Sequence, residues 1–323
     1  MSINRSNRFV SATHPQIEVI KPFSDAFPLT KRILFQPFDL KKWFVIGFAA
    51  WLSYLGAGFN YNYKFNGRSH WRNVPAFQEI RDFIDQIPSW VLVSGIAIFI
   101  SFIFAFVVVC TWLRARGRFM FIDCLVKNRG AIGEPWREFR REGNSYFLFA
   151  LVTGLIVALV LGLAGLPFLI PIVRGMPFTE HFFYLISVIV VWAVVFVVLV
   201  FGWAVISHFM IPVMYRRRCR AREGFRTAAR LIVDYPGEIT LYCLFWIVIG
   251  IASTTVACAT ILATCCIALI PYVGTVIMLP IFVFLRAFGL LFIRQFGTDY
   301  DVWAGISEPL TPSVPEPPPL PQT

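Results

Sequence analysis

Acidic residues are scarce in this chain, and long stretches carry no charge at all. Asp and Glu number 18 among 323 residues, and charged residues make up 15% of the chain, against about 25% in soluble domains. The longest uncharged stretch is Ile239–Leu285, 47 residues without Asp, Glu, Lys, Arg or His. Because one membrane span needs about 20 apolar residues, this stretch predicts two helical spans.

Catalytic and metal-binding motifs are also missing. The seven cysteines show no CxxC or zinc spacing, and the chain has no phosphate-binding loop. No Asp or Glu falls within a predicted span, which argues against a proton-coupled carrier. We therefore expect no enzymatic activity and no cofactor. The net charge of +11 accompanies no nucleic-acid-binding motif, so we expect the cations to orient the chain in a membrane.

Apolar segments of suitable length predict an all-α fold, a polytopic membrane helical bundle with six transmembrane helices. The expected spans are 43–59, 90–113, 146–166, 182–206, 239–262 and 272–293. They lie in a membrane domain, 24–297. We expect a disordered cytoplasmic tail before it, 1–23, and a proline-rich cytoplasmic tail after it, 298–323.

The distribution of cations predicts the orientation. The segments assigned to the inner side hold seven, eight and seven Lys and Arg residues, whereas the outer loops hold four and one. The asymmetry has the same sign at every crossing. We therefore expect both termini in the cytoplasm and the spans in a bacterial inner membrane.

The inner segments resemble one another, which indicates an internal repeat. Each has a short amphipathic helix, a helix breaker and then a transmembrane hairpin; the breakers are Gln36–Pro37, Gly143–Asn144 and Pro236–Gly237. The units would be 24–113, 132–215 and 222–295. Leu113–Gly117 also matches Leu285–Gly289 in four of five letters. Three parallel repeats and chance similarity between apolar segments both explain this pattern.

Two further segments carry a family resemblance. They are Pro37–Trp43, with the letters PFDLKKW, and the last apolar helix from Leu279–Pro280 to Gln295–Gly297. With the amphipathic helices, they make the chain similar to uncharacterised bacterial six-helix membrane proteins. Those resemble the membrane domain of some glycerophosphodiester phosphodiesterases. The catalytic barrel of those enzymes has no counterpart here, so the resemblance implies a membrane domain without that activity.

Arg286 is a cation well inside an apolar segment, a position that costs about 2.5–3.5 kcal/mol on insertion scales. One interpretation places Arg286, Arg114 and His208 in a cationic cluster at the inner leaflet that binds a lipid phosphate or another anion. The simpler interpretation, which the sequence favours, is an arginine that reaches to the inner headgroups or stands on a helix that continues into the cytoplasm, with a histidine that is packed or interfacial.

These patterns favour a non-enzymatic membrane scaffold or lipid-associating protein whose basic cytoplasmic face meets anionic headgroups. The competing interpretation is a transporter or channel for a small solute or lipid, with Arg286 as the anion contact. A transporter requires a polar cavity around Arg286, whereas a scaffold requires a packed centre. The expected partner is the lipid bilayer; a second copy of the chain or another membrane protein stays open.

Overall fold

The computed structural model describes residues 17–55, 88–168, 182–264 and 267–304, and this part of the chain is helical, without a β-strand. The prediction of an all-α fold is confirmed. The helices are α1 (Ile20–Phe35), α2 (Leu40–Tyr54), α4 (Ser89–Val126), α5 (Gly133–Glu138), α6 (Arg140–Gly165), α8 (Phe182–Arg217), α9 (Ala221–Asp234), α10 (Pro236–Ala263), α11 (Pro271–Ile277) and α12 (Leu279–Arg294). Short 3₁₀ turns cover Leu166–Phe168 and Ile267–Leu269.

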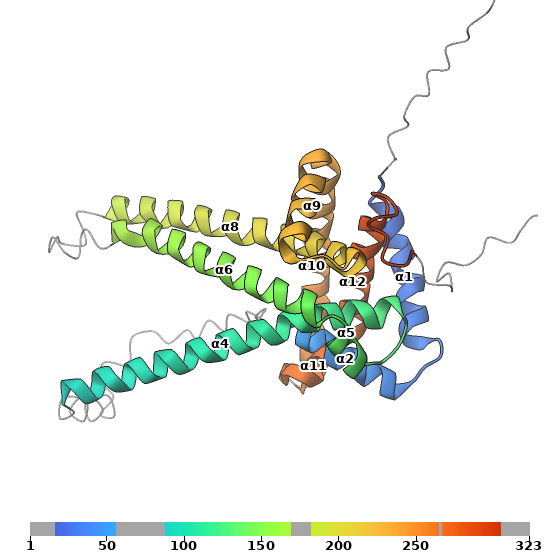
Figure 1. Ribbon diagram of the computed structural model, residues 1–323, viewed down its shortest axis with the longest axis horizontal. Helices are drawn as coiled ribbons and strands as arrows, with labels where there is room; N and C mark the ends of the chain where they lie inside the picture. Colours follow the sequence, from blue (N-terminus) through green and yellow to red (C-terminus); the bar gives the residue numbers. More distant parts are fainter. Residues whose placement is uncertain (1–16, 56–87, 169–181, 265–266, 305–323) are drawn as a thin grey trace, which may run out of the picture.

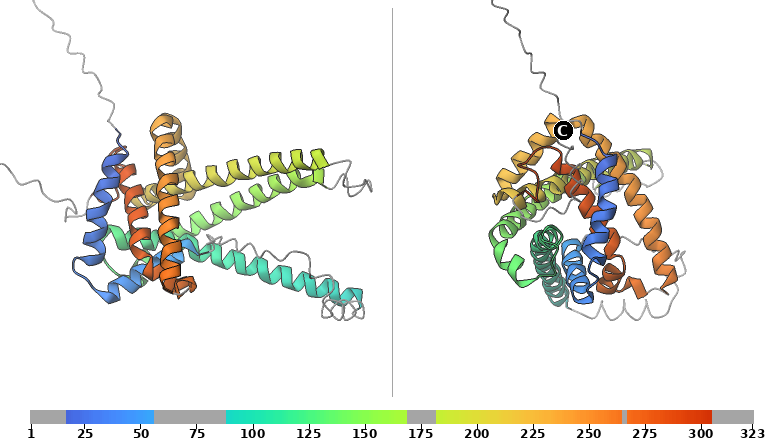
Figure 2. Two further views of the ribbon diagram at one scale, coloured as in Figure 1. Left: turned by 180° about the vertical axis from the view of Figure 1, so that it is seen from behind. Right: turned by 90° about the vertical axis from the view of Figure 1, so that its right-hand side faces the viewer.

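The helices form a packed body from which three long helices extend (Figure 1). α4, α6 and α8 leave the body toward the same side and alternate in direction along the chain. α6 and α8 stay side by side, whereas α4 diverges from them. α1, α10 and α12 run across these three helices (Figure 2). We call the protruding parts of α4, α6 and α8 the arms.

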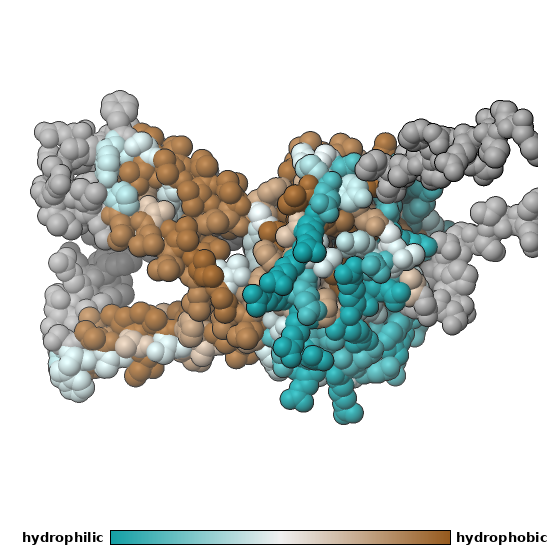
Figure 3. Space-filling view, turned by 45° about the horizontal axis from the view of Figure 1, so that its top comes forward, coloured by the Kyte–Doolittle hydropathy of each residue, from teal (hydrophilic) through white to brown (hydrophobic). Residues whose placement is uncertain are grey.

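Within the part of the chain that the structure describes, four helices are long and apolar enough to cross a membrane: α4, α6, α8 and α10. They contain the predicted spans 90–113, 146–166, 182–206 and 239–262. The most apolar window of each arm has no buried residue. Large side chains such as Ile98, Phe102 and Val198 are therefore exposed around the arms (Figure 3). Apolar surface of this extent is typical of a protein that faces lipid.

The body has one large hydrophobic core whose bulkiest side chains are phenylalanines. The largest fully buried residues include Phe119 and Phe121 of α4, Phe209 of α8 and Phe288 of α12. They come from the ends of α4 and α8 that lie opposite the arms, and from the middle of α12. α1, α2 and α9 add smaller apolar side chains around them. The core thus lies beyond the arms, at the basic side of the molecule.

The first and last predicted spans differ from the other four. α2 has 15 residues, and positions 56–59 of the predicted span 43–59 lie outside the described residues. The predicted span 272–293 is split between α11 and α12, so its prediction as one continuous helix is wrong. Pro280 has no N–H for the carbonyl of Val276, which instead accepts a hydrogen bond from Trp43 Nε1 at 3.2 Å. The six-span count stays a prediction.

Two predicted helix ends are also wrong. α4 continues beyond the predicted end at residue 113 to Val126, so that Arg114, Arg116 and Arg118 lie on a helix. Gly143 and Asn144 do not end a helix but lie inside α6. Arg116 of α4 explains both residues: a Cβ on Gly143 would lie 3.1 Å from Arg116 Cγ, and Asn144 Oδ1 accepts two hydrogen bonds from the same guanidinium.

The amphipathic segments agree better with the structure. α1 ends at Phe35, directly before the predicted breaker Gln36–Pro37, and α9 ends at Asp234, just before the predicted breaker Pro236–Gly237. Asp39 caps α2, because its side chain accepts a hydrogen bond from the Lys41 amide at 2.8 Å. Pro236 and Pro271 begin α10 and α11, where a missing N–H costs nothing. The turn between α10 and α11 therefore precedes Pro271.

An ion-pair network joins α4, α5 and α8 at the basic side. Asp123 is fully buried and accepts a hydrogen bond from the Tyr215 hydroxyl at 3.0 Å. Its carboxylate also pairs with Lys127 at 2.8 Å and with Arg129 at 3.1 Å. Lys127 pairs in turn with Glu138 at 3.0 Å. Each of these charged residues has a partner of opposite charge, so the network connects α4, α5 and α8.

Candidate anion-binding centre

Three arginines meet inside the body where α4 and α12 are in contact. Arg114 and Arg118 lie one turn apart on α4, and Arg286 lies on α12. Residues four apart share one face of a helix, which places both α4 arginines on the same side. Arg118 is close enough to Arg114 and to Arg286 for their like charges to interact. We call these three residues the arginine centre.

Tyrosines from three other helices surround the arginine centre. Tyr54 of α2 interacts electrostatically with all three arginines. Tyr146 of α6 interacts with Arg114 and Arg286, and its hydroxyl accepts a hydrogen bond from Arg118 Nη1. Tyr242 of α10 also interacts with Arg286. Five helices therefore contribute to this centre, and its polar groups other than the arginines are phenol hydroxyls.

The arginine centre has unused hydrogen-bond donors. Nε and Nη2 of Arg286 and Nε of Arg114 are buried and have no hydrogen-bond partner within the described residues. None of the ion pairs between described residues includes Arg114, Arg118 or Arg286. Buried polar groups nearly always have a partner, and an unpaired buried charge is costly. The arginine centre therefore has the chemistry of a site for an anion.

A neighbouring arginine shows the contrast. Arg116 follows Arg114 by two residues, on a different side of α4. Its Nε and Nη2 donate to Asn144 Oδ1 at 3.2 and 3.1 Å. Its guanidinium also lies 4.7 Å from the ring centroids of Trp112 and Trp136, within the range of cation–π attraction. Arg129 also has a buried Nε without a partner, but its Nη atoms are in ion pairs. Arg114 and Arg286 differ from both arginines in that they combine buried, unpaired donors with the lack of an ion pair within the described residues.

His208 lies beside the arginine centre and is held by Tyr242. The charge of Arg286 acts on His208, and His208 Nε2 is 2.7 Å from the Tyr242 hydroxyl. Gly289 of α12 makes room for this pair, because a Cβ there would lie 3.1 Å from the Tyr242 oxygen and still closer to His208 Nε2. A pocket of about 70 Å³ adjoins the two rings. His208 is therefore packed and hydrogen-bonded.

The structure brings together the three predicted site residues, Arg286, Arg114 and His208. It places Arg286 on α12 with its Nε and Nη2 buried inside the body. Sequence reasoning missed Arg118 and the tyrosines. Arg118 had a signal, since it stands one turn after Arg114 on the same helix face. Tyr54 had none, because it lies at the end of an apolar segment.

Comparison with curated proteins and with solved structures gave no match for this chain. The resemblance to the membrane domain of glycerophosphodiester phosphodiesterases stays a prediction. One family matches residues 17–298, which are most of the chain and include the arms, the body and the arginine centre. The chain therefore belongs to this family, which is described as a family of unknown function (DUF7544).

Proposed function

We propose that this membrane protein is a non-enzymatic, lipid-associating protein that holds the phosphate of an anionic lipid at the arginine centre. The observation that carries the proposal is the set of buried, unpaired N–H groups on Arg114 and Arg286. Guanidinium groups bind phosphate oxygens in a bidentate manner. A phosphate would supply both the missing hydrogen bonds and the missing negative charge.

The arms give such a lipid a route to the arginine centre. A bilayer that contains the exposed apolar arms has the body at one surface. An open gap separates the arm of α4 from those of α6 and α8 (Figure 3). Arg114 lies on α4 near the inner end of this gap, and its side chain is partly exposed. The lipid tails would lie between the arms, and the headgroup would reach the arginine centre from there.

The same placement agrees with the charge distribution. The basic segments 114–141 and 216–230 lie at the body, and the arms end on the other side. The proposed orientation therefore puts the basic side of the body at the cytoplasmic surface and the arms in the inner membrane, with both termini inside.

The alternative, a transporter or channel with Arg286 as its anion contact, has less support. The pocket at His208 and Tyr242, beside Arg286, has a volume of about 70 Å³, whereas small-molecule sites usually measure about 300–1,000 Å³. The predicted spans also lack the carboxylates that proton-driven carriers use. A lipid phosphate held from the gap between the arms needs no passage through the body.

Native mass spectrometry of the detergent-purified protein tests the proposal, because it reports which lipids stay bound. The variants are Arg286→Gln and Arg114→Gln, with Arg226→Gln on the exposed face of α9 as the matched control. A hydrogen bond to a charged group contributes about 1.5–3 kcal/mol, so each centre variant should lower retention of an anionic phospholipid about tenfold or more. Arg226→Gln should change it little.

The controls separate a specific site from general attraction. A zwitterionic phospholipid compared at the same concentration shows whether net charge matters, and thermal unfolding of each variant shows whether the body is intact. The proposal is wrong if folded Arg286→Gln protein retains the anionic lipid as the unsubstituted protein does. It is also wrong if Arg226→Gln lowers retention as much as the two centre variants.

A further inference from the structure

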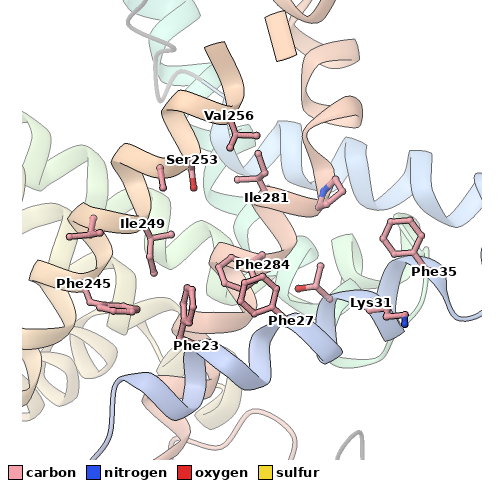
Figure 4. Close-up of a pocket in the computed structure, with 14 residues that line it drawn as sticks. Phe23, Phe27, Lys31, Phe35, Phe245, Ile249, Ser253, Val256, Ile281 and Phe284 are labelled. Atoms are coloured by element: carbon pink, nitrogen blue, oxygen red, sulfur yellow. The ribbon is translucent and has the colours of Figure 1, made fainter. Parts of the chain in front are cut away.

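An apolar groove of about 570 Å³ lies on another side of the body, between α1 and α10, with α12 as its floor (Figure 4). Phe23, Phe27 and Phe35 of α1 face it at intervals of four or eight residues, so they lie along one side of that helix. Phe245, Ile249 and Val256 of α10 form the opposite wall, as Figure 4 shows. Its volume falls within the usual range for small-molecule sites, about 300–1,000 Å³.

Aromatic contacts close one end of the groove. The Phe23 ring lies edge-on to those of Phe245 and Phe284, with centroids 5.2 and 5.4 Å apart. Phe27 packs against Phe284 as well, with centroids 4.6 Å apart. α1, α10 and α12 therefore meet at this end and separate toward the other. The groove is thus closed at this end and open along its side, a shape that suits an elongated apolar group.

Few polar groups line the groove, and one of them is a cation. Lys31 stands on α1 between Phe27 and Phe35, and its side chain is exposed. None of the ion pairs between described residues includes Lys31, and no Asp or Glu lines the groove. The Ser253 hydroxyl faces it from α10. Apolar walls with a cation at the open side fit an amphiphile with a negative head.

The length of the groove fits one acyl chain. From Phe23 to Lys31 the axis of α1 rises about 12 Å, and from Phe245 to Val256 that of α10 rises about 16 Å, at about 1.5 Å per residue. Half of a bilayer's hydrocarbon core, the depth that one acyl chain fills, is about 15 Å. A chain with its methyl end at the Phe23–Phe245 contact would therefore bring its head near Lys31.

We propose that this groove binds one acyl chain of an anionic phospholipid, with the phosphate at Lys31. The site is separate from the arginine centre. Arg286 follows Phe284 by two residues, which turns it about 200° around α12, away from the groove. Membrane lipid surrounds the apolar arms, so acyl chains are the apolar groups available in quantity to a groove on this protein.

Photo-crosslinking with an anionic phospholipid that carries a photoreactive acyl chain tests the proposal on the full-length protein in nanodiscs. Labelled peptides should come from α1, α10 and α12. Ser253→Trp, which fills the middle of the groove, should remove most of this labelling. Ile251→Trp is the matched control, since Ile251 is exposed on the same helix and does not line the groove, and it should label as the unsubstituted protein does.

The head of the lipid is tested with Lys31→Gln, and the control is Lys21→Gln on the same helix. Lys31→Gln should lower labelling by the anionic probe severalfold and leave labelling by a zwitterionic probe unchanged, while Lys21→Gln should alter neither. Labelling that persists in folded Ser253→Trp protein overturns the acyl-chain site. If labelling depends neither on the charge of the probe nor on Lys31→Gln, the assignment of the phosphate to Lys31 is wrong.

Other occupants give a different result. A photoreactive residue in place of Phe27 should capture lipid from the nanodisc. If it captures another segment of this chain, or a second copy, and no lipid, the acyl-chain proposal is wrong. Because the groove variants leave the arginine centre unchanged, failure here would leave the proposed phosphate site untouched, and failure of Arg286→Gln to release lipid would leave the groove untouched.

Discussion

Gly289→Ala should destabilise the protein although alanine favours a helix. Its Cβ would lie 3.1 Å from the Tyr242 hydroxyl and would overlap with His208 Nε2. Overpacking costs about 1–3 kcal/mol, and loss of the Tyr242–His208 hydrogen bond about 0.5–1.5 kcal/mol. The higher helix propensity of alanine offsets about 0.8–1.0 kcal/mol of this loss. The net loss should therefore be about 0.5–3.5 kcal/mol.

Thermal unfolding in detergent measures this loss, and Gly250→Ala is the matched control. Gly250 also lies inside a helix, but a Cβ there would meet nothing within 4 Å, so this variant should be as stable as the unsubstituted protein or slightly more so. His208→Ala added to Gly289→Ala should recover part of the loss, because it removes the ring that the new methyl group strikes. Equal stability of the two alanine variants would refute the packing around His208.

Three further predictions concern the ion-pair network and the orientation. Tyr215→Phe should lower the free energy of unfolding by about 1.5–3 kcal/mol, since the buried Asp123 carboxylate loses a donor; an unchanged unfolding midpoint contradicts this. Partial burial tends to raise the pKa of the Glu138 carboxyl, but hydrogen bonds and ion pairs with Lys127 and Arg218 lower it overall. Glu138→Gln should thus lower the melting temperature at neutral pH, and the difference should shrink as pH falls below about 4. Arg68→Cys should react with an impermeant thiol reagent on intact cells, and Arg217→Cys only after permeabilisation; the reverse pattern would contradict the orientation.

The sequence predicted the parts of the fold that depend on local patterns. Helix breakers are read from neighbouring residues, so Gln36–Pro37, directly after α1, and Pro236–Gly237, at the start of α10, were correctly interpreted. The same reasoning failed at Gly143 and Asn144, which lie inside α6 because both contact Arg116. That arginine lies on α4, more than 25 residues away in sequence. A local pattern does not contain that contact.

The arginine centre was predictable in part for a related reason. Arg286 and Arg114 each interrupt an apolar segment, and this marks them in sequence. Tyr54, Tyr146 and Tyr242 come from three different helices and are common residues at the ends of apolar segments. Only the packing of α2, α6 and α10 around α4 and α12 shows that their hydroxyls surround the arginines.

Hydropathy reports that a segment avoids water, but not whether lipid or protein replaces the water. α10 and α12 are both strongly apolar, yet α10 is mostly exposed and much of α12 is buried in the body. Burial in protein therefore changes where Arg286 can find hydrogen-bond partners. In lipid, the side chain would have to reach for the headgroups to find partners. Within the body, its partners must come from neighbouring residues or from a bound anion, and the described neighbours leave two of its N–H groups unpaired. The unusual feature is therefore the lack of a counter-charge beside this arginine, more than the presence of a charge in an apolar segment.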